Sequence, residues 1–158
     1  MRQLYLAATG MNRGKTTVAL GLMAALKERG HDIGFTKPVG QRYAIVDSQP
    51  ADEDAILMRS ALGLDDALAL MSPVHIPRGF TKSYIRGEVK SDLPARIREA
   101  HAALATRHDL LLVEGTGHAG VGSVVGLSNA VVAGMLRAPA VIVAEGGVGR
   151  PIDEIVLN

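Results

Sequence analysis

Short apolar runs and segments of helical periodicity alternate along the first part of the chain. Residues 4–8 are an apolar run of strand length, and residues 33–36 are a second one, closed by Pro38. Between them, residues 14–29 carry apolar side chains on one helical face, namely Val18, Leu22 and Leu26. Strand, glycine-containing loop, helix and strand predict a βαβ unit.

The same alternation continues to the last residues. The apolar spacing typical of helices recurs over residues 52–62, 93–107 and 127–136, and again from Pro151. Apolar runs over residues 110–113 and 140–144 predict two more buried strands. Three turn signals between residues 71 and 87 predict a loop with short helical pieces.

These elements predict an α/β fold. Strands that alternate with helices form a mostly parallel sheet with helices on both faces, a three-layer α/β/α arrangement. A length of 158 residues suits one compact domain, and the 47% of apolar residues suffice for a core. We therefore expect a single domain over residues 1–158.

The composition narrows the classes of partner. A formal net charge of +1 and an aromatic content of 3% provide neither a basic surface nor a stacking platform for nucleic acid. The chain has no cysteine, which removes disulfides and thiolate metal sites and is compatible with a reducing cytoplasm. No apolar segment reaches the roughly 18–20 residues of a membrane span. We expect a cytoplasmic protein without nucleic-acid or membrane partners.

The stretch ATGMNRGKTT, residues 8–17, joins the first predicted strand to the first predicted helix. It ends in GKT like the phosphate-binding motif GxxxxGK[ST], but Thr9 stands where that motif has its first glycine. Backbone N–H groups at a helix start favour a phosphate, Lys15 can bridge β- and γ-phosphates, and Thr16 can bind Mg²⁺. The residues expected at the phosphates are Met11, Asn12, Arg13, Gly14, Lys15, Thr16 and Thr17. A solvated lysine at an ordinary helix start is the alternative, and the position between strand and helix favours the phosphate loop.

Further charged residues occur where ligands bind in open α/β sheets, at the carboxyl ends of strands. Glu114 ends an apolar run before Gly-Thr-Gly and offers a carboxylate to Mg²⁺. Lys37 ends another strand and either projects into the same crevice or is a surface lysine before a turn proline. Asp52, Glu53 and Asp54 begin a predicted helix, where they bind metal or only complement the helix dipole.

Five histidines are scattered along the chain without the helical spacing of a zinc site. His118 lies in the glycine-rich loop after Glu114, and it is a candidate for a ligand contact. The glycines of this loop, Gly117 among them, allow the backbone to approach a ligand closely.

Four motifs in order make the chain similar to dethiobiotin synthetase. They are the loop with Thr9 and GKT, Lys-Pro-Val at residues 37–39, Asp-Ala at residues 54–55, and VEGTG at residues 113–117. The same motifs resemble the cobyrinic acid a,c-diamide synthase type of amide ligase and the N-terminal P-loop domain of some phosphotransacetylases. The resemblance implies a P-loop NTPase fold, ATP and Mg²⁺ as cofactors, and a metal held by Thr16, Asp54 and Glu114. It also implies that Lys15 and Lys37 hold the transferred phosphoryl group.

The resemblance extends to the segment GGVGRPIDE, residues 146–154. Dethiobiotin synthetase uses the corresponding helix N-terminus to bind substrate across a dimer interface. This implies a homodimer with residues 146–153 near its interface and an anionic small-molecule substrate. Gly117, His118 and Arg150 are the candidate substrate residues.

Two departures separate this chain from dethiobiotin synthetase. The family has acidic residues in its phosphate loop, where this chain has Met11, Asn12 and Arg13. The arginine suits a more anionic substrate or has a structural role. The family also continues for two more strands with a base-reading asparagine loop, so we expect a truncated or divergent member.

The motifs leave two functions open, besides the alternative of a fragment that folds but binds nucleotide poorly. The first is an ATP-dependent carbon-nitrogen ligase that activates a carboxylate or carbamate by phosphorylation, before an amine attacks it. The alternative is a regulatory or sensory ATP-binding module with weak or no catalysis. Lys37, Asp54 and Glu114 together favour a site competent for ATP hydrolysis, whereas the altered phosphate loop favours the sensor.

Overall fold

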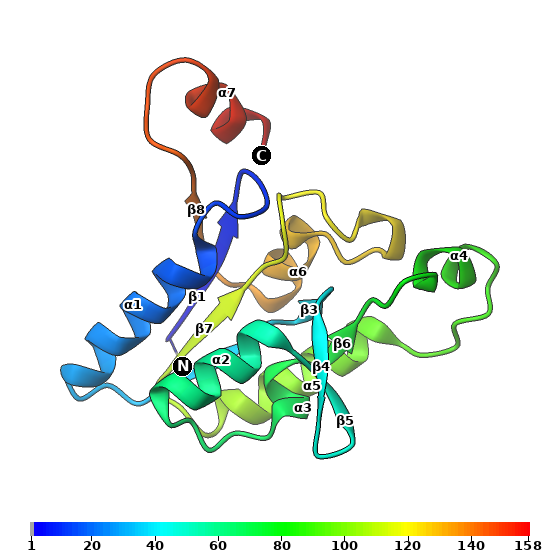
Figure 1. Cartoon of the computed structure of the whole chain (residues 1–158), viewed down its shortest axis with the longest axis horizontal. Helices are drawn as coiled ribbons and strands as arrows, with labels where there is room; N and C mark the ends of the chain where they lie inside the picture. Colours follow the sequence, from blue (N-terminus) through cyan, green and yellow to red (C-terminus); the bar gives the residue numbers. More distant parts are fainter. Residues whose placement is uncertain (1) are drawn as a thin grey trace.

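A four-stranded parallel sheet lies at the centre of the chain in a computed structural model that describes residues 2–158 (Figure 1). β1 (Arg2–Ala8) lies between β7 (Leu110–Glu114) and β8 (Ala140–Val143), and β2 (Ile33–Thr36) lies beyond β7. All three pairings are parallel. These are the four strands that the apolar runs predict, and the α/β fold of the P-loop type is confirmed.

Helices cover both faces of this sheet. On one face, α1 (Lys15–Glu28) and α2 (Glu53–Leu62) pack against apolar side chains of β1, β2 and β7. On the other face lie α5 (Leu93–Ala105) and α6 (Asn129–Leu136). The predicted three-layer arrangement follows from these two apolar clusters.

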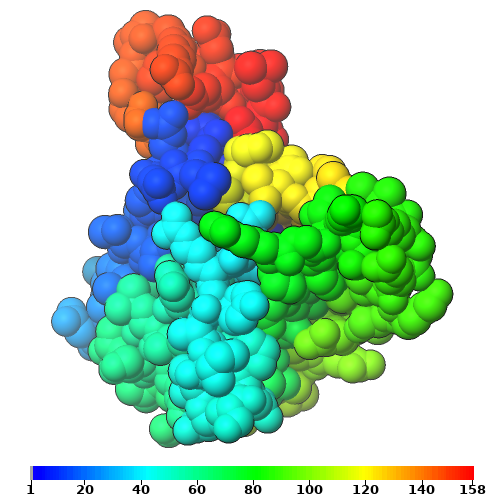
Figure 2. Space-filling model, turned by 45° about the vertical axis from the view of Figure 1, so that its right-hand side comes forward, coloured from blue at the N-terminus to red at the C-terminus, as the bar shows by residue number. Residues whose placement is uncertain are grey.

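The C-terminal segment stands apart from these layers. After β8 the chain passes through a glycine-containing turn into α7 (Arg150–Leu157), which has no buried residue. Figure 2 shows this orange-to-red segment as a projection above the blue N-terminal loop. Within residues 2–158, no helix combines the length and apolar character that a bilayer crossing requires.

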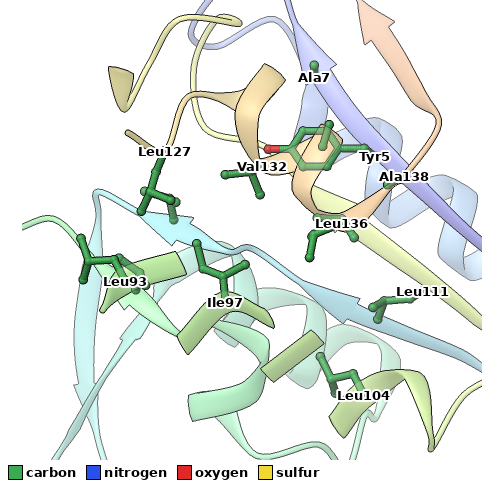
Figure 3. Close-up of a cluster of buried hydrophobic side chains, with 14 of the residues drawn as sticks. Tyr5, Ala7, Leu93, Ile97, Leu104, Leu111, Leu127, Val132, Leu136 and Ala138 are labelled. Carbon is green, nitrogen blue, oxygen red and sulfur yellow. The ribbon is translucent and has the colours of Figure 1, made fainter. Parts of the chain in front are cut away.

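The alternation of side chains along β1 divides the core in two. Tyr5 and Ala7 point toward α5 and α6, whereas Leu6 points toward α1 and α2. Figure 3 shows Tyr5 together with Ile97 of α5 and Val132 of α6 in the first of these clusters. Each face of the sheet is therefore apolar, as expected for parallel strands covered on both sides.

The exposed face of α1 differs from the prediction. Its buried residues are Lys15, Ala19 and Met23, and Val18 is 42% exposed. The phosphate loop sets this rotation because Lys15 must point inward, and the residues four and eight positions later then share its face. Val18 is therefore wrongly predicted to face the core, whereas Leu22 and Leu26 pack against it as predicted.

Two small strand pairs outside the main sheet were not predicted. β4 (Tyr43–Val46) and β5 (Gln49–Asp52) form an antiparallel hairpin, and β3 (Val39–Gly40) pairs in parallel with β6 (Val74–His75). The hairpin turns at Asp47 and Ser48, whose φ angles of 50° and 63° are left-handed. No glycine marks this turn, and Pro50 argues against a strand, so the pattern did not reveal it.

Short helical pieces complete the fold. α3 (Leu68–Met71) and α4 (Phe80–Ile85) flank β6, and α4 agrees with the short helical pieces predicted between residues 71 and 87, whereas α3 precedes that loop. A 3₁₀ helix, η1 (Ser123–Val125), lies in the glycine-rich loop between β7 and α6.

Candidate functional site

A cavity of about 320 Å³ opens at the carboxyl ends of β1, β2 and β7. Its lining comprises residues 11–17 and 114–117 together with Lys37, Gln41, Arg42, Glu53 and Asp54. The structure thus gathers every predicted phosphate-loop residue, both predicted catalytic lysines and the three predicted metal ligands around one space. This is the edge of an open α/β sheet where ligands bind.

The phosphate loop presents backbone donors to this cavity. Gly14, with a φ angle of 84°, precedes α1, and no side chain caps the helix. The first turn of α1 also has no acidic residue. An uncapped N-terminus leaves N–H groups available, and together with the helix dipole they favour an anion such as phosphate.

Lys15 already points across the cavity. Its Nζ donates a hydrogen bond to the carbonyl oxygen of Gly117, 3.2 Å away. Burial lowers the pKa of Lys15, while the carboxylate of Glu114 opposes this shift. Gly117 has a φ angle of 63°, which favours glycine where the chain turns its carbonyl toward the lysine.

Glu114 is a buried carboxylate at the end of β7. Its Oε1 accepts a hydrogen bond of 2.8 Å from Oγ1 of Thr16, and its side chain is almost fully buried. Among residues 2–158, no group forms a hydrogen bond with Oε2. Burial raises the pKa of Glu114 to about 7, and the nearby Asp54 carboxylate contributes. This oxygen is therefore available to a ligand, a water or an ion in the cavity that Glu114 lines.

The three predicted metal ligands place oxygen donors suited to Mg²⁺ at one cavity. Thr16 and Glu114 are in contact, and Asp54 lines the same cavity with 27% of its side chain exposed. Across residues 2–158, no three histidine or acidic side chains form a closed metal cage. Mg²⁺ is usually held by one or two carboxylates together with substrate phosphates and waters, which matches the oxygen donors present.

Lys37 is buried between two carboxylates, so the surface-lysine alternative is wrong. Its Nζ lies 3.0 Å from Oδ1 of Asp52 and also forms an ion pair with Asp54. Burial disfavours the charge of Lys37, but the two carboxylates outweigh it and raise the pKa. The helix-capping alternative applies to Asp52, whose Oδ1 accepts a hydrogen bond from the backbone N–H of Asp54.

Arg13 is tied to the C-terminal segment. It forms ion pairs with Glu145 and with Glu154 of α7, the second at 3.4 Å. Oγ1 of Thr9 donates to the same Glu154 carboxylate at 3.3 Å. These contacts favour the structural interpretation of Arg13 over substrate binding.

Two of the three predicted substrate residues lie outside the cavity. Gly117 lines it, but His118 is exposed and its Nδ1 accepts a hydrogen bond from the N–H of Gly120. Arg150 is 80% exposed in its side chain and pairs with Glu154. The structure of one chain therefore places neither His118 nor Arg150 in the cavity lining, although Arg150 shares Glu154 with Arg13 of the phosphate loop.

Comparison with known proteins agrees with this geometry. The profile of a family described as an AAA domain matches residues 2–158. The chain belongs to this family. It is a dethiobiotin synthetase-like P-loop NTPase, as the four motifs predict.

Several relatives carry the name ATP-dependent dethiobiotin synthetase BioD. That of Anaeromyxobacter dehalogenans is 31% identical over 150 residues, which cover 94% of this chain and 66% of the relative. That of Methanocaldococcus jannaschii is 28% identical over 120 residues, 72% of this chain and 52% of the relative. The chain thus spans about half to two thirds of the length of these relatives.

The fold also occurs in a solved kinase structure. The kinase domain of Escherichia coli tyrosine kinase ETK matches 99% of this chain and 60% of its own, with a TM-score of 0.56. At 15% sequence identity, this likeness supports the fold alone.

One residue of this dethiobiotin synthetase-like site escaped the sequence analysis. Asn129, at the start of α6, donates hydrogen bonds from Nδ2 to the carbonyls of Thr116 and His118, at 2.9 and 2.7 Å. Its Oδ1 accepts from the N–H of Thr116 and the hydroxyl of Tyr5. The side chain therefore fixes the loop that carries Gly117. An asparagine following the helix cap Ser128 was its only signal in the sequence.

Proposed function

We propose that this chain forms the Mg·ATP site of a carbon-nitrogen ligase of the dethiobiotin synthetase type. The observation that supports this most strongly is the gathering of Lys15, Lys37, Thr16, Asp54 and Glu114 around one cavity at an uncapped helix start. Two ammonium groups and a carboxylate pair suit a polyphosphate with its metal.

Different residues of the cavity bind the phosphates and the metal ion during phosphoryl transfer. The N–H groups of the phosphate loop and Lys15 hold the β- and γ-phosphates, and Lys37 faces the group that is transferred. Thr16, Asp54 and Glu114 hold Mg²⁺, which neutralises phosphate charge when bound. Catalysis then consists mainly of positioning and charge stabilisation.

The proposed reaction has two steps. An oxygen of a carboxylate or carbamate attacks the γ-phosphorus, the bond to the β–γ bridging oxygen breaks, and ADP leaves. An amine nitrogen then attacks the carbon of the mixed anhydride, phosphate leaves, and the amine loses a proton. The substrate is a small anionic molecule, and a homodimer would add Arg150 of a second copy to its site.

A regulatory ATP-binding module is the second candidate. The contacts of Arg13 and Thr9 with Glu154 link the phosphate loop directly to α7, which has no buried residue. Such a link would allow nucleotide binding to alter the position of α7, as a sensor requires.

ADP formation distinguishes the two candidates. The protein is supplied with Mg·ATP and either bicarbonate plus a panel of diamines or a panel of carboxylates plus ammonia. A ligase forms ADP only with its co-substrates, and Glu114→Gln lowers that rate, whereas the exposed Glu99→Gln does not. ATP binding without co-substrate-dependent ADP formation would favour the sensor, and absence of ATP binding would rule out both.

A further inference from the structure

Asp52 is a fully buried carboxylate that the proposed site does not use. It is the last residue of β5 and the N-cap of α2, and its exposed fraction is 0%. It does not line the cavity, unlike Asp54 two residues later. Aspartate is almost never fully buried unless it is paired, because leaving water is costly for a charge.

Oδ1 of this carboxylate has two polar partners, whereas Oδ2 forms no hydrogen bond within residues 2–158. Oδ1 accepts from the backbone N–H of Asp54 at 2.9 Å and lies 3.0 Å from Nζ of Lys37. The backbone N–H of Asp52 donates to Oγ of Ser72 at 3.1 Å. A Cβ atom added at Gly40 would lie 2.5 Å from Oδ2, so the missing side chain of that glycine makes room for the carboxylate.

Helix capping alone does not explain the burial of Asp52. Asp92 caps α5 by the same type of hydrogen bond, to the N–H of Ala95 at 2.9 Å, yet Asp92 is exposed. Asparagine and serine cap helices about as well as aspartate does. A neutral cap would serve α2 without the cost of burying a charge, so the ammonium of Lys37 is the contact that requires a carboxylate.

The two partners of Lys37 differ in what else they can bind. Asp54 faces the cavity and is a candidate Mg²⁺ ligand, so its carboxylate is open to other cations. Asp52 is enclosed and has no access to the cavity. We propose that Asp52 is a positioning residue, which holds the ammonium of Lys37 toward the phosphoryl group when Asp54 is engaged elsewhere. This inference rests on the proposed function because it assigns Lys37 to the phosphoryl group.

Asp52→Asn tests the inference because it keeps the cap and removes the charge. Calorimetry on the full chain compares the affinities for Mg·ATP and Mg·ADP. We expect the preference for ATP over ADP to fall by about tenfold. The affinity for ADP should stay the same, since the phosphate loop and Lys15 hold that nucleotide. Asp92→Asn, the matched cap variant, should change neither affinity.

A double-mutant cycle with Lys37→Met separates positioning from a general charge effect. If Asp52 acts through Lys37, Asp52→Asn causes no further loss of ATP preference in the Lys37→Met protein. An equal loss in both backgrounds would overturn the inference. So would an unchanged preference in Asp52→Asn itself.

A measurement without nucleotide or metal covers the case in which Lys37→Met does not fold. In ¹⁵N-labelled protein, an ammonium held by carboxylates exchanges slowly enough to give a side-chain signal, which Lys37→Arg assigns by its loss. Asp54 also pairs with Lys37 in the nucleotide-free protein, so the comparison is made in the Asp54→Asn background, where we expect Asp52→Asn to abolish this signal and Asp92→Asn to retain it. A signal that survives Asp52→Asn in that background, or that is absent from the Asp54→Asn protein, would contradict the inference. Failure of the wild type to bind Mg·ATP would instead contradict the proposed function, and the ammonium signal would still test the link to Asp52.

Discussion

The ammonium of Lys15 donates a hydrogen bond to the carbonyl oxygen of Gly117, so the first helix and the loop after β7 meet across the cavity. The two residues are 102 positions apart in the chain. Because Lys15 is already buried and oriented, its side chain needs little ordering when a phosphate arrives. A phosphate oxygen is also a stronger partner for an ammonium than a neutral carbonyl is.

Replacing Lys15 should therefore weaken nucleotide binding. Lys15→Ala removes charge-assisted hydrogen bonds that are each worth roughly 1.5–3 kcal/mol, so the affinity for Mg·ATP should fall at least about tenfold. Isothermal calorimetry measures this, with the exposed Lys82→Ala as the control. Equal affinities of wild type and Lys15→Ala would show that the loop does not bind phosphate.

Glu114 should make the stability of the nucleotide-free protein depend on pH. Burial raises its pKa to about 7, from 4.5 for an ordinary glutamate. Between these values the folded protein binds a proton that the unfolded chain does not, so the free energy of unfolding should fall as the pH rises from about 5 to about 8.

Glu114→Gln should remove this pH dependence and stabilise the protein at pH 8 by up to about 3 kcal/mol. Denaturant unfolding at pH 5.5 and pH 8, without Mg²⁺ or nucleotide, provides the measurement. Glu99→Gln, on the exposed face of α5, should behave as the wild type does. A wild-type stability that rises over this interval, with no gain from Glu114→Gln, would argue against a raised pKa.

Asn129 should control the loop that carries Gly117. Asn129→Leu leaves the backbone groups of Thr116 and the carbonyl of His118 without their partners in a buried place, which should cost about 3 kcal/mol of folding stability. Tyr5→Phe removes one hydrogen bond and should cost about 1 kcal/mol.

Denaturant unfolding and hydrogen exchange in residues 115–119 test this role. Tyr43→Phe is the control, since Tyr43 lies on the exposed hairpin strand β4. If Asn129→Leu unfolds at the wild-type denaturant concentration, the hydrogen bonds of Asn129 do not stabilise the loop.

The local pattern of apolar and polar residues was enough to predict the four-stranded sheet and the phosphate loop. Each of the four sheet strands is a short apolar run, because parallel strands are buried on both faces. The sequence GKT at the start of a helix places a lysine beside backbone donors whatever the rest of the fold does. These features depend on neighbours in sequence, and they were predictable.

Contacts between distant segments were not predictable in this way. Helix capping accounts for the acidic residues 52–54 from sequence alone, and only the unpredicted hairpin brings Asp52 beneath Lys37. The pair of Arg13 and Glu154 joins residues 141 positions apart. No periodicity or motif carries information about such a pair.

That distant pair leads to a prediction about α7. Arg13→Ala removes two ion pairs that hold α7 near the phosphate loop, so cleavage in residues 146–149 should become faster. The effect on global stability should stay below about 1 kcal/mol, because the pairs are partly exposed. Limited proteolysis measures this, and Arg86→Ala, which breaks the surface pair with Glu88, is the control. Wild-type cleavage rates in Arg13→Ala would indicate that other contacts hold α7.

The exposed apolar side chains near α7 predict association of two copies. Ile152, Val156 and Leu157 are 49%, 80% and 85% exposed, and Val141 of the edge strand β8 is 45% exposed. Exposed apolar groups gathered on one segment are typical of an interaction surface. We expect a homodimer with residues 146–153 near its interface.

Light scattering at micromolar concentration should therefore give the mass of two chains, and Val156→Asp should shift the protein toward the mass of one chain.

Arg150→Glu tests whether the interface also contributes to the substrate site. Its side chain is 80% exposed and does not line the cavity of its own chain, so we expect it to contact a substrate held between two copies. The variant should still bind Mg·ATP, since no phosphate-loop residue changes, but it should lose ADP formation that depends on an anionic co-substrate. Arg86→Glu, on another surface and with a side chain that is 58% exposed, should retain it. A monomer at every concentration, or an Arg150→Glu dimer with wild-type ADP formation, would leave the site within a single chain.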